Sequence, residues 1–429
     1  MHDDVVAALD EHAVSLSSTD PDADPDDLTP LIESLDGAAV VGLGEATHGT
    51  REFFRLKHRL IRLLVAELGF RTVAVEAGVA ATLAADQYVR GGEGDPETAL
   101  AELYAWQYRT EAVRVLLQWL REFNEGRPPD DQVHVRGVDL SDPSVPAEPL
   151  RALLRYADVV PVPNDLGVLA ASDGPPDDEA SRARYLSRAK TAATAVGKRL
   201  DADRESFVEE TSAEPYALTR HLARVVVRNC EWHRVRHEHD GPHEAGMAER
   251  DRHVAANVEW CLEQDPGTGA AVWAHDGHVK RGTFDDGRPW TDAETMGEHL
   301  DRELGDSYYP LGFDFGRGSF RAMDGSDPDA TEPRTFTVGD PPARTATAHF
   351  DALDSPAFVD LASVGDDSRL SGWFEEKPGV RHVGSVYDPD AEAGTYVQRT
   401  DLPASFDWLV FLGESTPTRP ADGDPVTTN

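Results

Sequence analysis

The stretch AAVVGLGEATHG, residues 38–49, decides the fold expected for this chain. Its first six residues form a continuous apolar run, which is typical of a parallel strand buried on both faces. Residues 50–68 then repeat apolar side chains at helical spacing and end at Gly69, a common helix C-cap. A second buried strand is predicted at 72–75, so this segment predicts a β-α-β unit. We therefore expect an α/β fold with a central, mostly parallel sheet flanked by helices.

The rest of the chain supplies further strands and helices for this sheet. Apolar runs predict strands at 132–140, 269–273, 309–315 and 408–412. Helical spacing predicts a long helical region at 99–125, which holds Trp106, Tyr108 and Trp119. An Asp-, Pro- and Thr-rich loop is expected at 324–350, and the polar residues after Gly413 are expected to fray.

One region departs from the alternation of strands and helices. Residues 146–254 are mainly helical in pattern and carry few strand signals, so they predict a helical insertion or cap. Residues 1–145 and 255–429 then form a discontinuous α/β catalytic core. We expect the insertion to cover the site and to influence the shape of the substrate that enters.

Acidic residues dominate the composition. The chain has 79 Asp and Glu residues and only 41 Lys and Arg residues, which gives a formal net charge of −38. A chain this acidic repels nucleic-acid phosphates and anionic lipid, so neither is an expected partner. The acids are spread along the chain, which predicts a solvated acidic surface and a salt-adapted host. The first thirty residues lack a signal-peptide core, and no apolar run reaches about 18 residues. We expect a cytoplasmic protein with a small-molecule substrate; the sequence leaves its oligomeric state open.

Ionisable residues follow four predicted strands, at the point where each strand ends. They are Glu45 and His48 on the first, Glu76 on the second, Asp139 on the third, and His275 and His278 on the fourth. In α/β folds the ligand site lies beyond the carboxyl ends of the strands, so these residues are expected to meet in one cleft. Asp139 also fits a structural role as a helix cap or turn residue.

This set of side chains suits the activation of water. A histidine titrates near neutral pH and can accept a proton from water, while a carboxylate can orient the imidazole and stabilise its cation. A second histidine, His275 or His278, can polarise a carbonyl or protonate a leaving alcohol. The sequence lacks the G-x-S-x-G and G-x-x-x-x-G-K-[ST] motifs, which argues against a serine α/β-hydrolase and a P-loop NTPase.

Several stretches resemble the signature blocks of the erythromycin esterase family. They are GEATHGT at 44–50, VEAG at 75–78, Arg250-Asp251 with ANV at 256–258, WAHDGHV at 273–279 and FDWLVF at 406–411. The resemblance covers about residues 30–418. It implies an enzyme that hydrolyses carboxylic esters or macrolide lactones, with His48 as the general base that activates water.

The resemblance also assigns roles around this base. Glu45 and Glu76 match the family's glutamates, and either can orient His48, while His275 and His278 match its histidine pair. Supporting or substrate-binding positions are expected at Lys57, Trp106, Asp139 and Arg250. The chain departs from the pattern at Asp276, where asparagine is frequent, and at Lys57, where arginine is expected. Trp106 and Tyr108 fit either a pocket for an apolar substrate or the core.

Two other functions fit the same residues. A metal-dependent hydrolase, or a metal- or haem-binding protein, could use Glu45, His48, Glu76 and His275, although no cofactor is required by the base mechanism. A second histidine cluster, at His233, His237, His239 and His243, supports metal binding weakly. The remaining alternative is a binding protein that has kept the fold without the chemistry.

Overall fold

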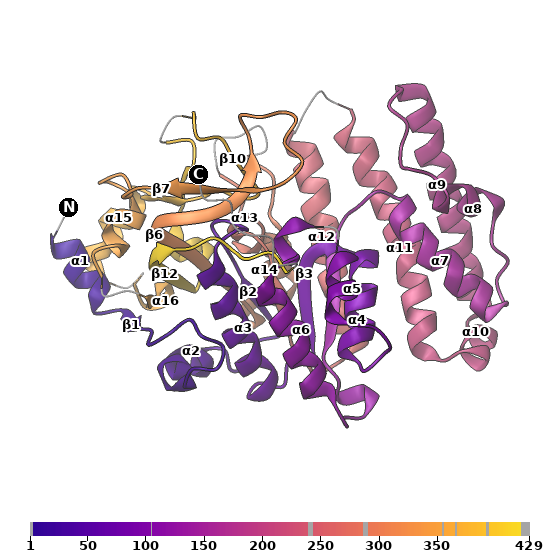
Figure 1. Ribbon diagram of the computed structural model, residues 1–429, viewed down its shortest axis with the longest axis horizontal. Helices are drawn as coiled ribbons and strands as arrows, with labels where there is room; N and C mark the ends of the chain where they lie inside the picture. Colours follow the sequence, from indigo (N-terminus) through magenta and orange to yellow (C-terminus); the bar gives the residue numbers. More distant parts are fainter. Residues whose placement is uncertain are drawn as a thin grey trace.

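The computed structural model describes residues 3–103, 105–238, 243–285, 291–353, 356–364, 367–391 and 394–421. Within them a ten-stranded sheet lies at the centre of the molecule (Figure 1). Its main path runs in the order β1 (Ala13–Ser15), β8 (Ala357–Asp360), β12 (Trp408–Ser415), β6 (Tyr308–Asp324), β2 (Val40–Leu43), β5 (Ala270–Trp273), β3 (Thr72–Gly78) and β4 (His134–Asp139). The six strands from β12 to β4 are parallel, and β8 and β1 add antiparallel pairs at one edge. The predicted α/β fold with a mostly parallel sheet is confirmed.

Two layers of helices cover the faces of this sheet. One core cluster joins Val41 of β2 to apolar residues of α3 (Arg51–Ala66) and α6 (Glu111–Asn124). The other joins its neighbour Val40 to α12 (Glu244–Gln264) and α14 (Met296–Leu304). Successive side chains of a strand point to opposite faces, so a continuous apolar run supplies both cores.

A group of helices forms a separate layer beside the sheet, at the right of Figure 1. It comprises α7 (Ser144–Ala157), α8 (Asn164–Ala170), α9 (Glu179–Ala202), α10 (Arg204–Glu210) and α11 (Ala213–Arg236). These helices share their own apolar cluster, which reaches Val79 after β3. Helix α12 crosses the predicted boundary at 254/255, and its residues pack on the sheet. The role of this layer as a cap stays a prediction.

The remaining elements are short. They are α1 (Asp3–Asp10), α2 (Thr29–Ser34), α4 (Leu83–Val89), α13 (Asp276–Val279), α16 (Leu361–Val364), α17 (Ser368–Glu375), α18 (Leu402–Ser405), β9 (Gly379–Arg381), β10 (Val386–Tyr387), β11 (Val397–Arg399) and five 3-10 turns. None of the helices in the described ranges is long and apolar enough to cross a membrane.

The region predicted to be helical at 99–125 is helical at both ends and is interrupted in the middle. Helix α5 (Pro96–Ala101) ends early, a 3-10 turn holds Trp106–Tyr108, and α6 begins after Thr110. The side chain of Thr110 caps α6 by accepting from Val113 N at 3.3 Å. Short-range periodicity could not reveal this break, because the turn is fixed by the contacts of Tyr108 with β3 and β5.

The loop predicted at 324–350 is only partly right, and the fraying predicted after Gly413 is wrong for residues 414–421; residues 422–429 lie outside the described part of the chain. The second half of β6 extends beyond the parallel sheet and pairs with β7 (Arg334–Val338), and α15 (Ala346–Phe350) follows. After β12, Thr416 N donates to Glu52 Oε2 at 2.7 Å and Thr418 N to Gly49 O at 2.9 Å. The backbone of this described part of the tail thus has partners around the start of α3.

Candidate active site

The turn after β2 is the starting point of the site, and two glycines fix its shape. A Cβ atom on Gly44 would lie 1.9 Å from Asp276 Oδ1, and one on Gly49 would lie 1.9 Å from Arg321 O. Neither position can carry a side chain without moving the backbone around it. The tight turn brings Glu45 and His48, three residues apart, into direct contact.

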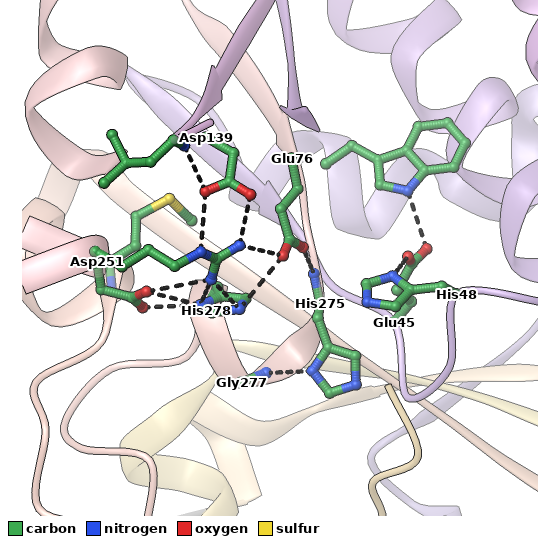
Figure 2. Close-up of polar contacts among 12 residues, drawn as sticks. Glu45, His48, Glu76, Asp139, Asp251, His275, Gly277 and His278 are labelled. Carbon is green, nitrogen blue, oxygen red and sulfur yellow. Dashed lines mark hydrogen bonds and ion pairs between the residues drawn. The ribbon is translucent and has the colours of Figure 1, made fainter. Parts of the chain in front are cut away.

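Glu45, His48, Lys57 and Trp273 form the first group of polar contacts, here called the His48 network (Figure 2 labels Glu45 and His48). Glu45 Oε1 lies 2.6 Å from His48 Nδ1. Its other oxygen accepts from Lys57 Nζ at 2.6 Å and from Trp273 Nε1 at 2.9 Å. The carboxylate is fully buried and both of its oxygens are engaged. Among the described residues His48 Nε2 has no hydrogen-bond partner, and the His48 side chain is 7% exposed.

Lys57 supports this network from beneath. Its side chain is fully buried, with Nζ 4.7 Å from the centre of the Trp273 ring. Burial lowers the pKa of Lys57, and the Glu45 carboxylate acts in the opposite direction. Lysine therefore fills the position where the family pattern predicts arginine, and its contact is with Glu45.

Glu76, Asp139, Arg250, Asp251 and His278 form the second group, the Arg250 network (Figure 2). Arg250 Nε and Nη2 donate to the two oxygens of Asp139 at 2.9 and 2.7 Å, and Nη2 also donates to Glu76 Oε1 at 2.8 Å. His278 lies between Asp251, with Nδ1 2.8 Å from Oδ2, and Arg250, with Nη1 2.7 Å from Nε2. Both ring nitrogens of His278 are thus engaged within the protein.

Buried charge sets the ionisation of this network. Burial raises the pKa of Glu76, but the charges of His278 and Arg250 outweigh it and hold that pKa well below its usual range. Burial lowers the pKa of His278, and the carboxylate of Asp251 reverses that effect, so the net shift is upward. The network therefore favours an ionised Glu76, and the Asp251 carboxylate shifts the pKa of His278 upward.

His275 lies between the two networks (Figure 2). Its backbone N donates to Glu76 Oε2 at 2.9 Å, and its ring centre is 5.2 Å from that of His48. Burial, with the charges of His382 and His48, holds the pKa of His275 well below its usual range, so the ring is neutral. Nδ1 accepts from Gly277 N at 3.0 Å, which assigns the proton to Nε2, 3.4 Å from Ala46 O.

The structure thus brings the five residues expected to carry the chemistry into one region. They are divided between the His48 network and the Arg250 network, with His275 between the two. Glu45, and not Glu76, contacts His48; Glu76 is committed to Arg250 and to the backbone of His275. Asp139 accepts from Arg250 as well as from its neighbour Leu140 N.

Trp106 and Asp276 have other surroundings. Trp106 is half-buried and stacks against Arg321, whose guanidinium is 5.7 Å from the ring centre. Its expected contact with substrate stays a prediction. Asp276 accepts from Phe313 N at 3.1 Å, and burial raises its pKa well above the usual range. Burial therefore favours the neutral form of this carboxyl, at the position where the sequence departs from the asparagine of the family pattern.

Sequence reasoning missed His382, Asp251 and the role of Tyr108. The His382 ring is buried 4.5 Å from that of His275, and the next residues bond to the motif turn, with Val383 N 2.8 Å from Ala46 O. No strand or motif marks His382 in the sequence. The sequence did contain a signal for Asp251, because it directly follows Arg250 in one of the blocks that resemble the family. The hydroxyl of Tyr108 accepts from Glu76 N at 3.0 Å and donates to Trp273 O at 3.3 Å.

The residues proposed for a metal do not form a ligand set. Within the described ranges, three ligand atoms come within 4.8 Å of one another only at Glu231, Glu249 and His253, which none of the expected sites includes. The carboxylates of Glu45 and Glu76 are engaged in two different networks. In the second histidine cluster, the His233 and His237 rings stack 5.8 Å apart, His243 caps α12, and His239 lies outside the described residues.

Comparison with known proteins links these features to one family. The family model for erythromycin esterase matches residues 65–415. The chain is 25% identical over 331 residues to erythromycin esterase type II of Escherichia coli, covering 68% of this chain and 72% of that protein. It is 24% identical over 437 residues to YbfO of Bacillus subtilis, covering 96% and 91%.

Solved structures share the fold. A Bacillus cereus protein superimposes with a TM-score of 0.82 at 22% identity, covering 97% of this chain and 98% of the other. A mutant of the erythromycin esterase EreC in its open conformation gives 0.68 at 17% identity, covering 96% and 98%. The family match spans most of the chain and includes Glu76, Arg250 and His275. This protein therefore belongs to the erythromycin esterase family.

Proposed function

We propose that the protein hydrolyses a carboxylic ester or lactone by direct attack of water, with His48 as the general base. Family membership supports a hydrolase of the erythromycin esterase type acting on a small molecule. The observation that carries the mechanism is the asymmetry of the His48 ring. Its Nδ1 is held at 2.6 Å by a buried carboxylate, while its Nε2 has no partner in the described part of the chain.

The two ring nitrogens of His48 have different roles in the proposed base catalysis. With Nδ1 donating its hydrogen to Glu45, Nε2 carries a lone pair and can take a proton from water. The water oxygen bonds to the carbonyl carbon, and the carbonyl π electrons move to its oxygen. When that oxyanion collapses, the bond to the leaving oxygen breaks and the alkoxide takes the proton back from His48 Nε2. The charge of Glu45 stabilises the imidazolium between these two steps.

His275 is the better of the two remaining histidines for the carbonyl oxygen. It is neutral, its Nε2–H is only weakly bound at 3.4 Å from Ala46 O, and its ring is 5.2 Å from that of His48. A donor placed there can stabilise the oxyanion. His278 is unsuited to this task, because Asp251 and Arg250 occupy both of its nitrogens. We assign it, with Glu76 and Arg250, to positioning His275.

The test is a hydrolysis assay on p-nitrophenyl esters, aliphatic lactones and macrolides, with the native chain and His48→Asn. The native chain should hydrolyse members of at least one class, and His48→Asn should be inactive on that class with an unchanged circular dichroism spectrum. Turnover by His48→Asn at the native rate contradicts the assignment. A parallel arm with a chelator should leave the rate unchanged; loss that is restored by one divalent metal supports the metal-dependent alternative.

A further inference from the structure

A groove between α3 and α6 lies outside the candidate active site. It encloses about 380 Å³ and is closed by the loop at 20–22 and by Thr418 and Arg419. None of its lining residues belongs to the His48 or Arg250 network. Its size is within the roughly 300–1,000 Å³ range of small-molecule sites.

One end of the groove carries positive charge, in a protein whose net charge is −38. Arg51 and Arg419 lie there with a single carboxylate, Glu111, which is 3.7 Å from Arg419 Nη1. Arg51 has no acidic partner among the described residues. A guanidinium presents a planar pair of donors that suits a carboxylate.

The other arginines of the groove are already neutralised. Arg55 pairs with Asp20, and Arg62 with Asp22. The remaining acid, Glu122, is exposed on α6 and lies eleven residues from Glu111, about 16 Å along the helix. An anion held at Arg51 would therefore not meet an unpaired carboxylate.

Two buried polar atoms of the lining residues lack a partner. Thr418 is 1% exposed and His58 is 2% exposed, yet Thr418 Oγ1 and His58 Nε2 have no hydrogen bond. Such atoms are costly unless a ligand or water satisfies them. Burial and the charge of Arg62 lower the pKa of His58 to about 3, so the ring is neutral and adds no charge to the groove.

The middle of the groove is apolar. Val115 of α6 is 40% exposed, although it is a large hydrophobic residue, and the Trp119 indole lies 6.0 Å from the His58 ring. Arg51 and His58 are seven residues apart on α3, which separates the charged end from this apolar wall by about 10 Å.

We propose that this groove binds a small organic monocarboxylate with an aromatic body. The carboxylate pairs with the guanidinium of Arg51 at the part of the groove that Thr418 lines. The aromatic body lies along Val115 and Trp119. The site is independent of the proposed hydrolysis, since it shares no residue with the two networks.

The test is calorimetric titration of the full chain with 4-phenylbutyrate, in about 1 M KCl, where the Debye length is about 3 Å and the overall negative charge is screened. The neutral analogue 4-phenylbutanol and the short acid butyrate separate the contributions of charge and ring. Saturable binding of phenylbutyrate, with clearly weaker binding of both analogues, is expected. Equal affinity for phenylbutanol, or absence of saturable binding of phenylbutyrate, overturns the proposal.

Variants place the site on the protein. Arg51→Gln should weaken binding by about tenfold or more, because it removes a charge-assisted contact. Arg234→Gln, on the exposed end of α11, is the matched control and should bind as the native chain does. Val115→Asp puts a carboxylate into the groove and should abolish binding. Val115→Asn introduces a side chain of the same shape as aspartate but without the charge, and it should retain most of the binding. Native affinity in both Arg51→Gln and Val115→Asp shows that the ligand binds elsewhere.

Discussion

The two polar networks of the site contain the same kinds of side chain but differ in what they leave free. In the His48 network the carboxylate of Glu45 is saturated with donors and the imidazole keeps one open nitrogen. In the Arg250 network the imidazole of His278 is itself saturated, between Asp251 and Arg250. A histidine after a strand is therefore reactive or structural according to its partners, and we infer chemistry for the first network and positioning for the second.

The largest effect should come from His48→Ala. Removal of a general base typically costs about 10²–10⁴-fold in rate. We expect kcat on the best ester substrate to fall by at least this factor, with a melting temperature close to the native value. His237→Asn, at an exposed histidine directly after α11, is the matched control and should keep full activity. A similar loss in both variants would remove the distinction between His48 and other histidines.

Arg250→Met should mainly reduce stability. It leaves Glu76 and Asp139 as buried or half-buried carboxylates without their shared cation, and breaking such a pair costs about 3–5 kcal/mol. The free energy of unfolding from urea denaturation measures this loss. Arg234→Gln, which breaks an exposed pair with Glu238, should change it by less than about 1 kcal/mol. Unchanged stability in Arg250→Met would show that the Arg250 network does not hold the site together.

Glu45→Gln tests how the His48 network orients its base. The amide is close to the carboxylate in shape, but it cannot stabilise an imidazolium and it leaves Lys57 without its buried counter-charge. A charge-assisted hydrogen bond contributes about 1.5–3 kcal/mol, so kcat should fall roughly tenfold to a hundredfold. Glu76→Gln should affect kcat less than Glu45→Gln does. The reverse order would reassign the orienting carboxylate to Glu76.

The smallest effect concerns the pH dependence of stability. The lowered pKa of Glu76 contributes stability that is present above its unfolded pKa of about 4.3 and is lost in more acidic solution. The raised pKa of His278 contributes stability that is complete below its unfolded pKa of about 6.5 and is lost as the pH rises through the folded value. The Arg250 network should thus be most stabilising between about pH 4.5 and 6.5.

The measurement is the free energy of unfolding at several pH values for the native chain, Glu76→Gln and His278→Asn. Glu76→Gln should flatten the decline on the acid side, and His278→Asn should flatten the decline above about pH 6.5. Curves parallel to the native one would mean that neither group titrates differently on folding.

Much of the site could be predicted because the sheet organises it. Glu45, His48, His275 and His278 follow strands, and Glu76 and Asp139 lie at the ends of strands; these strands are parallel neighbours in the order β2-β5-β3-β4, so their carboxyl ends meet at one edge. Lys57 was expected to support the site, although its partner was not known. Tyr108 and His382 could not be placed, because one sits in a turn that interrupts a helical pattern and the other in a segment without any pattern.

The sequence by itself determined the strands and the motif turn, because apolar runs and close-packed glycines act over a few residues. It also brought Glu45 next to His48, three positions along the chain. Only the tertiary structure decided which carboxylate serves which histidine. Two buried glutamates are chemically alike until their counter-charges are known, and those come from Lys57 on α3 and Arg250 on α12. The packing of distant helices on the two faces of the sheet therefore gives His48 and His278 different partners: His48 keeps one nitrogen without a partner among the described residues, and both nitrogens of His278 are engaged.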